Sequence, residues 1–209
     1  MNWRSLFRPA ARLLPSRWLI TRGPSDRSAI ALTFDDGPLD STPGCLDVLD
    51  ELGLRATFFV VGKEVQAHPD LCLEMVGRGH EVAGHGFTHS YFPALEYRAL
   101  ADELARTAEL LPPQPFRPLV RPPAGAISPT SLWNTMRSGY TTVLWSLDCF
   151  DWRTQDASEI ATELEQARAG DILLLHEGSA PTLEALRVAK AAWQRRGLDC
   201  VTLSDLCGL

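Results

Sequence analysis

The sequence predicts a single α/β domain in which parallel strands close into a barrel. From Ala29 onward, short runs rich in β-branched and aromatic residues alternate with longer segments of helical period, which is the pattern of successive βα units. Polar residues able to carry chemistry follow the ends of several of these strands, and a barrel gathers all its strand ends on one face. A length of 209 residues agrees with one core rather than two.

The individual elements follow from local patterning. Apolar runs bounded by turn residues predict about seven strands, and helical periods with capping or stop residues predict the helices between them. The strands are expected at residues 29–34, 56–61, 81–83, 118–120, 140–145, 171–175 and 200–203. Helices are expected from Thr42-Pro43 onward, over 95–111 up to Pro112-Pro113, from Ser128 as N-cap and Pro129 as first residue, from a capping box at 156–159, and over 184–195.

Composition and charge limit the function classes. The formal net charge is −6, and residues 1–22 contain five arginines and no acidic residue, so the rest of the chain is more acidic than the total suggests. An acidic body argues against a nucleic-acid or polyanionic substrate, which needs a basic surface near the site. A neutral glycan fits better. The five cysteines form no CxxC pair, and an odd number cannot complete a disulfide framework, which is typical of reduced thiols in a cytoplasmic protein.

Residues 1–25 form a basic segment that is expected to be a short helix or an arm packed on the domain. The segment lacks the apolar core of a signal peptide, and no stretch of the chain has the length of a membrane span, so a cytoplasmic location is expected. Arg4, Arg8 and Arg12 recur at helical spacing opposite apolar residues. This pattern leaves open a peripheral contact of residues 1–22 with the inner face of the membrane. Nothing in the sequence indicates an oligomeric state.

Two adjacent aspartates directly follow the strand expected at 29–34. Asp35 and Asp36 are followed by Gly37 and Pro38, which turn the chain. Neighbouring residues at the end of a strand point in different directions, so one carboxylate can bind a metal while the other lies beside it. A turn or a helix cap would use one of these aspartates and leave the second unexplained.

Two histidines four residues apart indicate a metal site. His85 and His89, with one aspartate, make a three-ligand set that leaves coordination positions open for a water molecule. Zn²⁺ is the expected ion, and Co²⁺, Fe²⁺ or Ni²⁺ suit the same kind of donor set. A non-haem iron oxygenase uses such a triad too, but it would leave Asp35, Arg121 and His176 without a role.

The remaining strand-end residues supply acid–base chemistry. If Asp36 is the metal ligand, Asp35 is free to act as general base, and a nearby Arg121 would keep that base ionised. His176 ends the apolar run 172–175, and a carboxylate such as Asp151 would keep it protonated as a general acid. A histidine buried in the core for packing alone is the competing interpretation of His176.

In their order along the chain, these motifs resemble those of the polysaccharide deacetylases of carbohydrate esterase family 4. The resemblance covers roughly residues 29–206 and is carried by the segments 33–38, 85–89, 121–125, 148–152 and 173–176. It implies a distorted (β/α)7 barrel, similar to a TIM barrel, with the catalytic domain at 26–209 after the segment 1–25. It also implies hydrolysis of the acetyl group of an N-acetylated sugar in an oligosaccharide, a polysaccharide or a lipid-linked glycan, with release of acetate.

The resemblance assigns a role to each motif residue. The catalytic group comprises Asp35 as base and His176 as acid, with Arg121 and Asp151 tuning them; the metal ligands are Asp36, His85 and His89. The substrate pocket comprises Ala124, whose backbone N–H would contact the oxyanion, together with Pro123, Trp152 and Leu174.

The chain departs from the family pattern at two positions. Gly86 stands where Ser or Thr usually follows the first histidine ligand, so a hydrogen bond that stabilises the loop is either lost or supplied by Thr88. Ala124 stands where an aromatic residue is common, which keeps the backbone N–H but changes how a sugar packs there. Two alternatives remain open: removal of a formyl or another small acyl group from a sugar, and a non-catalytic glycan-binding protein on the same fold.

Overall fold

The computed structural model describes residues 15–113 and 118–209, and all its strand pairings are parallel. Nine strands form one sheet in the order β1-β6-β5-β4-β3-β2-β8-β7, with β9 beside β2. The strands are β1 Leu19–Ile20, β2 Ala29–Asp35, β3 Ala56–Val60, β4 Glu81–Gly84, β5 Leu119–Val120, β6 Thr141–Val143, β7 Leu147–Asp148, β8 Ile172–His176 and β9 Asp199–Val201.

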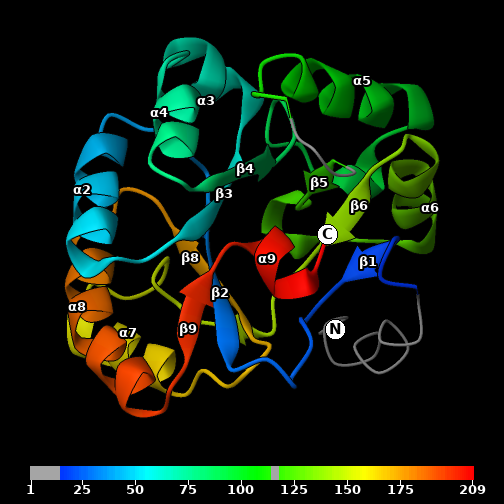
Figure 1. Cartoon of the computed structure of the whole chain (residues 1–209). Coiled ribbons are helices and arrows are strands. Elements are labelled where there is room, and N and C mark those ends of the chain that lie inside the picture. Colours follow the sequence, from blue (N-terminus) through cyan, green and yellow to red (C-terminus); the bar gives the residue numbers. More distant parts are fainter. Residues whose placement is uncertain (1–14, 114–117) are drawn as a thin grey trace.

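Helices surround this sheet and give the distorted barrel that the sequence predicts (Figure 1). They are α2 Thr42–Leu52, α3 Gly62–Ala67, α4 Leu71–Gly77, α5 Tyr97–Ala108, α6 Pro129–Arg137, α7 Ala157–Glu165 and α8 Ala180–Arg195, with 3₁₀ turns η1 Phe92–Ala94 and η2 Pro123–Gly125. The end strands β1 and β7 do not pair with each other in the described residues, so the barrel is open along that seam.

The alternation of side chains along the strands separates two apolar layers. In β2, Ile30, Leu32 and Phe34 pack outward against the helices, whereas Ala31 packs inward with residues such as Phe59 and Ile172. Because side chains alternate with a period of two, the inward stripe of β2 continues through Thr33 to Asp35. The polar side chains at the end of this otherwise apolar strand therefore point into the barrel near its opening.

The opposite end of the barrel is closed by the short helix α9, Leu203–Cys207, which lies at the centre of the view in Figure 1. Leu203 and Leu206 are fully buried in the inner apolar layer. Glu81 at the start of β4 is buried there, and its carboxylate accepts hydrogen bonds from the Thr57 hydroxyl and from the backbone N–H and hydroxyl of Ser204. The inner layer is thus covered at one end and carries the polar strand ends at the other.

The seven expected strands are all present, with boundaries shifted by up to two residues, and two strands were not expected. Strands β1 and β7 have two residues each, too few to show a period. Strand β1 lies within the segment 1–25 and pairs with β6, so the described part of that segment packs on the domain. The expected membrane contact of residues 1–22 involves arginines that lie mostly outside the described residues.

The expected helix starts are confirmed at Thr42 and at Pro129, where Ser128 forms a capping box with Ser131. The capping box expected at 156–159 is wrong in its second half. Asp156 does cap α7 by accepting from the Ser158 N–H, but its own N–H donates to the Thr154 hydroxyl, which leaves no donor for a reciprocal bond. Helix α8 begins at Ala180 rather than at residue 184, because Ser179 caps it.

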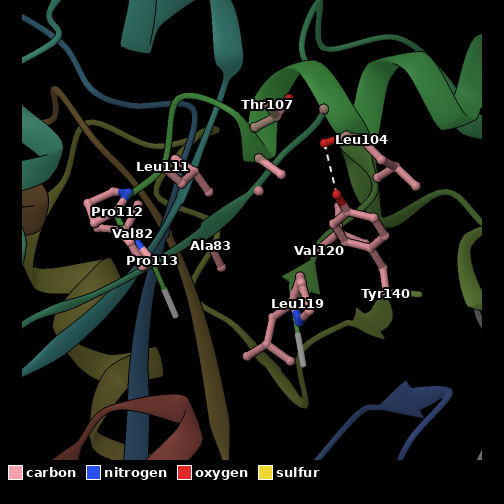
Figure 2. A pocket seen from close by; sticks show the side chains of 14 residues that line it. Val82, Ala83, Leu104, Thr107, Leu111, Pro112, Pro113, Leu119, Val120 and Tyr140 are labelled. Atoms are coloured by element: carbon pink, nitrogen blue, oxygen red, sulfur yellow. Dashed lines mark hydrogen bonds between the residues drawn. The ribbon is translucent and has the colours of Figure 1, made fainter. Parts of the chain in front are cut away.

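Figure 2 shows a pocket of about 150 Å³ between α5 and the strands β4 and β5. Its lining is mostly apolar, and the hydroxyl of Tyr140 donates a hydrogen bond to the Leu104 carbonyl at 3.1 Å.

Among the helices that the structure describes, none combines the length and the apolar character that crossing a membrane requires.

Candidate active site

Asp35 is the last residue of strand β2 and Asp36 follows it, and the two carboxylates face different partners. Asp35 is buried, and it pairs in register with His176 on β8. Asp36 has a left-handed backbone, with φ of 75°, which a residue other than Gly rarely adopts. The conformation turns the Asp36 carboxylate away from the strand and toward the two histidines. Strain of this kind persists only where the surroundings hold it, as they do at functional sites.

The carboxylate of Asp36 and the rings of His85 and His89 converge on one point. Asp36 Oδ1 lies 3.4 Å from His85 Nε2 and 3.1 Å from His89 Nε2, and one donor atom from each residue lies within 4.8 Å of the others. Burial alone would raise the pKa of Asp36, but hydrogen bonds with the two histidines outweigh it and lower that pKa. The hydrogen bond with Asp36 is also the main cause that raises the pKa of His89.

The ring of His85 is oriented by a backbone partner. Its Nδ1 lies 2.7 Å from the carbonyl oxygen of Arg121, and a carbonyl only accepts, so Nδ1 carries the proton. Nε2 is then the ring nitrogen of His85 that faces Asp36 and can bind a metal ion. Metal-binding histidines commonly have their other ring nitrogen fixed in this way. Two imidazoles and one carboxylate in this arrangement fit a divalent metal ion.

Arg121 holds the carboxylate of Asp35 from inside the barrel. Its guanidinium is fully buried and donates to Asp35 Oδ1 at 2.6 Å and to the Thr33 hydroxyl at 2.8 Å. The guanidinium carbon lies 4.0 Å from the ring centroid of Phe59, which supports it from below. The other oxygen, Asp35 Oδ2, faces the metal-ligand set and lies 3.8 Å from His85 Nε2. One oxygen of Asp35 is therefore fixed, and the other is directed at the pocket.

His176 is held by Asp151 on the other side of the pocket. Asp151 Oδ1 lies 2.8 Å from His176 Nδ1, and Oδ2 accepts from the His176 backbone N–H at 2.8 Å and from the Thr182 hydroxyl at 3.1 Å. Burial alone would lower the pKa of His176, but the hydrogen bond and charge of Asp151, with the charges of Asp35 and Asp36, raise it above its ordinary value. This favours the protonated imidazolium that a general acid requires.

These groups surround a pocket of about 360 Å³ at the mouth of the barrel. Its lining residues are Asp35, Asp36, His85, His89, Ala124, Trp145, Asp148, Trp152, Leu174 and His176. Three predicted site residues lie outside this lining: Arg121 and Asp151 contact the pocket only through Asp35 and His176, and Pro123 is buried at the start of the turn that carries Ala124. Trp152, 59% exposed, stands at the rim.

Trp145 and Asp148 line the pocket although no role is predicted for them. Trp145 packs on the backbone of Gly125, where a Cβ would lie 2.4 Å from the indole ring. Gly125 has a φ of 61°, so both its conformation and this contact require glycine. A tryptophan at the end of the run 140–145 was the available signal, but its contact with Gly125 depends on how β5 and β6 pair.

The loop between the two histidines explains the departure at Gly86. Gly86 has a φ of 82°, and a Cβ there would lie 3.2 Å from Glu103 Oε2 and from the Phe92 ring, so Ser or Thr would be strained. The alternative that Thr88 supplies the stabilising bond is supported, because its hydroxyl donates to Glu103 Oε1 at 2.5 Å. Glu103 itself was not predicted; an acidic residue among the buried positions of α5 was the available signal.

Comparisons with known proteins identify relatives of the chain. The sequence profile of the polysaccharide deacetylase family matches residues 22–143. The chain is 33% identical over 202 residues to a peptidoglycan-N-acetylglucosamine deacetylase of Bacillus cereus, covering 93% of this chain and 95% of that protein. It is 35% identical over 201 residues to a chitooligosaccharide deacetylase of Bradyrhizobium sp., covering 87% and 92%. A crystal structure of a peptidoglycan N-acetylglucosamine deacetylase superposes with a TM-score of 0.84 at 27% identity, covering 92% of this chain and 94% of the other.

Proposed function

The chain belongs to the polysaccharide deacetylase family, and from this premise we propose that its pocket hydrolyses the acetamide of an N-acetylated sugar to acetate and a free amine, with Asp35 as base and His176 as acid. Its relatives are deacetylases of carbohydrates, which makes the chain a carbohydrate N-deacetylase. The assignment of the individual residues is the part that we infer from geometry.

The observation that supports these roles is that a carboxylate and an imidazole, each held by a partner of opposite charge, face the same pocket. Asp35 is ion-paired with Arg121 at 2.6 Å, and His176 is paired with Asp151 at 2.8 Å. A cation fixes the carboxylate on one wall, and a carboxylate fixes the imidazole on the other. A carboxylate and an imidazole held in this way at one pocket are suited to act together as base and acid.

The reaction requires an addition and an elimination at the acetamide carbon. A divalent metal ion held by Asp36, His85 and His89 would polarise the carbonyl and make water more acidic. Asp35 removes a proton from the attacking water as the new C–O bond forms at the carbonyl carbon. His176 then gives its proton to the nitrogen as the C–N bond breaks, which leaves acetate and an amine. Ala124 lies on the pocket wall, where we propose that its backbone N–H contacts the oxyanion.

We propose Zn²⁺ as the ion, because two imidazoles and a carboxylate are common zinc donors, with Co²⁺, Fe²⁺ and Ni²⁺ as alternatives. The substrate that we propose is an N-acetylglucosamine unit of an oligosaccharide, with the sugar against Trp152 at the rim and the acetyl group between Leu174 and Trp145. A cytoplasmic location, with residues 1–22 at the membrane, is also a proposal; it would favour sugar precursors over a mature wall polymer.

A formyl-specific enzyme is the second candidate, because formyl is smaller than acetyl and fits any pocket that accepts acetyl. The two are distinguished by supplying both acyl groups on the same sugar and measuring acetate and formate release. A non-catalytic glycan-binding protein is disfavoured, because the described site contains a base, an acid and three donors for a metal. Binding of acetylated sugars with no release of either acid would favour it.

The test of the proposed function compares Asp35→Asn with His85→Ala in the metal-loaded protein. We expect Asp35→Asn to keep its metal content. Its rate of acetate release from chitooligosaccharides should fall about 10²- to 10⁴-fold, because a general base contributes about that factor. His85→Ala is expected to lose metal and activity together. Metal content is measured by elemental analysis after desalting. A fully active Asp35→Asn variant would show that Asp35 is not the base.

A further inference from the structure

The loop from His85 to His89 is hydrogen-bonded to a buried carboxylate that belongs to neither the metal-ligand set nor the acid–base pairs. Glu103 extends from α5, and its Oε2 accepts from the backbone N–H of Phe87 at 2.7 Å and from that of Thr88 at 2.8 Å. Its Oε1 accepts from the Thr88 hydroxyl at 2.5 Å. The same hydroxyl lies 2.6 Å from that of Ser90. One side chain therefore satisfies three donors of a five-residue loop.

The opposite edge of this loop is fixed by backbone groups. The carbonyls of Gly86 and Phe87 accept from the N–H groups of Gly62 and Lys63 at the start of α3, each at 3.0 Å. The ring of Phe87 fills the space above Gly62, where a Cβ would lie 2.4 Å from it. The loop is thus held between α3, which takes its carbonyls, and Glu103, which takes its N–H groups.

This double attachment matters because the loop carries the two histidines of the metal-ligand set and has left-handed backbone at Gly86 and His89. His89 has a left-handed φ of 58° and a half-exposed side chain, whereas His85 is buried. Buried N–H groups without acceptors are unfavourable, so without Glu103 the loop would rearrange to find partners in water. Such a rearrangement displaces His89 from Asp36 first, because His85 remains bonded to the Arg121 carbonyl.

We propose that Glu103 is a positioning residue for the metal site, acting through the backbone of residues 87 and 88 on His89. The inference rests on the proposed function, since it takes His85 and His89 as metal ligands. Glu103 touches neither the pocket nor the ligand atoms, so its effect is on metal affinity and on the geometry of the bound ion rather than on a chemical step.

The conservative variant Glu103→Gln distinguishes geometry from charge. The amide oxygen of glutamine can take the place of Oε2 and accept both backbone N–H groups. The amide NH₂ then faces the Thr88 hydroxyl, which can turn to accept from it and donate to Ser90 instead. Glu103→Gln is therefore expected to keep near wild-type metal affinity. Glu103→Ala removes both acceptor oxygens and with them all three hydrogen bonds. It is expected to weaken Zn²⁺ binding about 10- to 100-fold, as loss of a group that orients a metal ligand commonly does.

The experiment measures Zn²⁺ affinity of the full chain by competition with a chelating dye, and the visible spectrum of the Co²⁺-loaded protein, for wild type, Glu103→Ala, Glu103→Gln and Thr88→Val. The matched control is Glu81→Ala, which removes an equally buried, hydrogen-bonded carboxylate at the opposite end of the barrel. We expect both alanine variants to be less stable but only Glu103→Ala to lose Zn²⁺ affinity and change the Co²⁺ spectrum. Thr88→Val, which removes one of the three bonds, should show a smaller change in the same direction.

The outcomes separate this inference from the proposed function. Failure of the wild-type protein to bind metal would overturn the metal site itself. A wild type that binds Zn²⁺ while Glu103→Ala binds it equally well would overturn the role of Glu103 and leave the site intact. If Glu103→Ala does not fold, the other two variants still test the proposal. Wild-type Zn²⁺ affinity in Thr88→Val together with a full loss of Zn²⁺ affinity in Glu103→Gln would contradict it. That result would mean that the charge of Glu103, rather than its hydrogen-bonded geometry, controls metal binding.

Discussion

Three of the side chains that face the pocket have a partner one layer deeper. Asp35 is backed by Arg121, His176 by Asp151, and His85 by the Arg121 carbonyl. Arg121 contributes through both its side chain and its backbone, so it connects the base to the metal-ligand set. A substitution of Arg121 would remove the ion pair with Asp35 but keep the backbone carbonyl that His85 contacts, whereas a substitution of Asp151 perturbs the acid.

The alkaline limit of activity is expected to depend on the hydrogen-bonded pair that Asp151 forms with His176. The pKa of His176 is raised, and a general acid must be protonated, so activity is retained below this pKa and lost as pH rises through it. Asp151→Asn removes the hydrogen-bonded charge that raises the pKa and leaves the burial that lowers it. We expect the alkaline limb of kcat/KM to move to lower pH by about one unit or more.

The control for this prediction is Thr182→Val, which removes one hydrogen bond to Asp151 and keeps its charge. Its alkaline limb should lie close to that of the wild type. An NMR titration of the His176 ring in both variants checks that the limb reports this residue. An unchanged limb in Asp151→Asn would show that another group controls the alkaline side.

Several pocket residues that the sequence predicts stand at the end of a strand, or just after it, where alternate side chains of that strand point into the barrel. Asp35 and His176 could be anticipated because period-two alternation and parallel pairing bring such residues together. The partners behind or beside them divide into two kinds. Arg121 and Asp151 stand in recognisable motifs, whereas Glu103 and Trp145 come from a helix face and a strand end whose contacts depend on the packed fold.

At the scale of the elements, two glycines in different settings give opposite expectations for stability. Gly86 has a φ of 82° and only tight space for a Cβ, so Gly86→Ser should lower the free energy of unfolding by about 1–3 kcal/mol. Gly44 lies inside α2, and a Cβ there meets nothing within 4 Å. Gly44→Ala should raise the free energy of unfolding by about 0.5–1 kcal/mol.

Chemical denaturation in the presence of a chelator measures both variants without a contribution from metal binding. The pair is informative because Gly86 is one of the two positions at which the motifs depart from the family pattern. If Gly86→Ser proves as stable as the wild type, the loop has a second conformation that accommodates the side chain, and the account of this departure is wrong.

The starts of helices were predictable where the sequence carries a clear local start signal. Helices α2 and α6 begin where Thr42 and Ser128 indicate, because a proline at the start fixes the first turn. Strands β1 and β7 were missed because two residues carry no periodicity, and tertiary pairing alone creates them. The reciprocal bond expected at Asp156 was lost to Thr154, a local competitor that the capping pattern does not reveal.

At the scale of the whole molecule, the two ends of the barrel have separate tasks. Leu206 on α9 fills the closed end and packs on Gly23, where a Cβ would lie 2.6 Å from the leucine side chain. Leu206→Ala should lower the free energy of unfolding by about 2–5 kcal/mol, because it leaves a cavity in a core that cannot fully collapse.

Metal affinity and kcat of the folded Leu206→Ala protein should match the wild type, because the site lies at the other end of the strands. Thermal unfolding, Zn²⁺ competition and acetate release at a temperature well below the transition test the two statements separately. A large fall in kcat at full folding would show that the closed end communicates with the mouth through the inner layer.

The closed end also determines how the enzyme can be attached to a support. Helix α9 lies at the end of the barrel opposite the pocket, and Asp205 on this helix is exposed. A protein anchored to a bead through an exposed position of α9 would present its pocket outward, toward the solution. Long or insoluble acetylated chains, which cannot enter a porous matrix, would then still reach the catalytic pocket, so an anchor at α9 suits a reusable deacetylation surface.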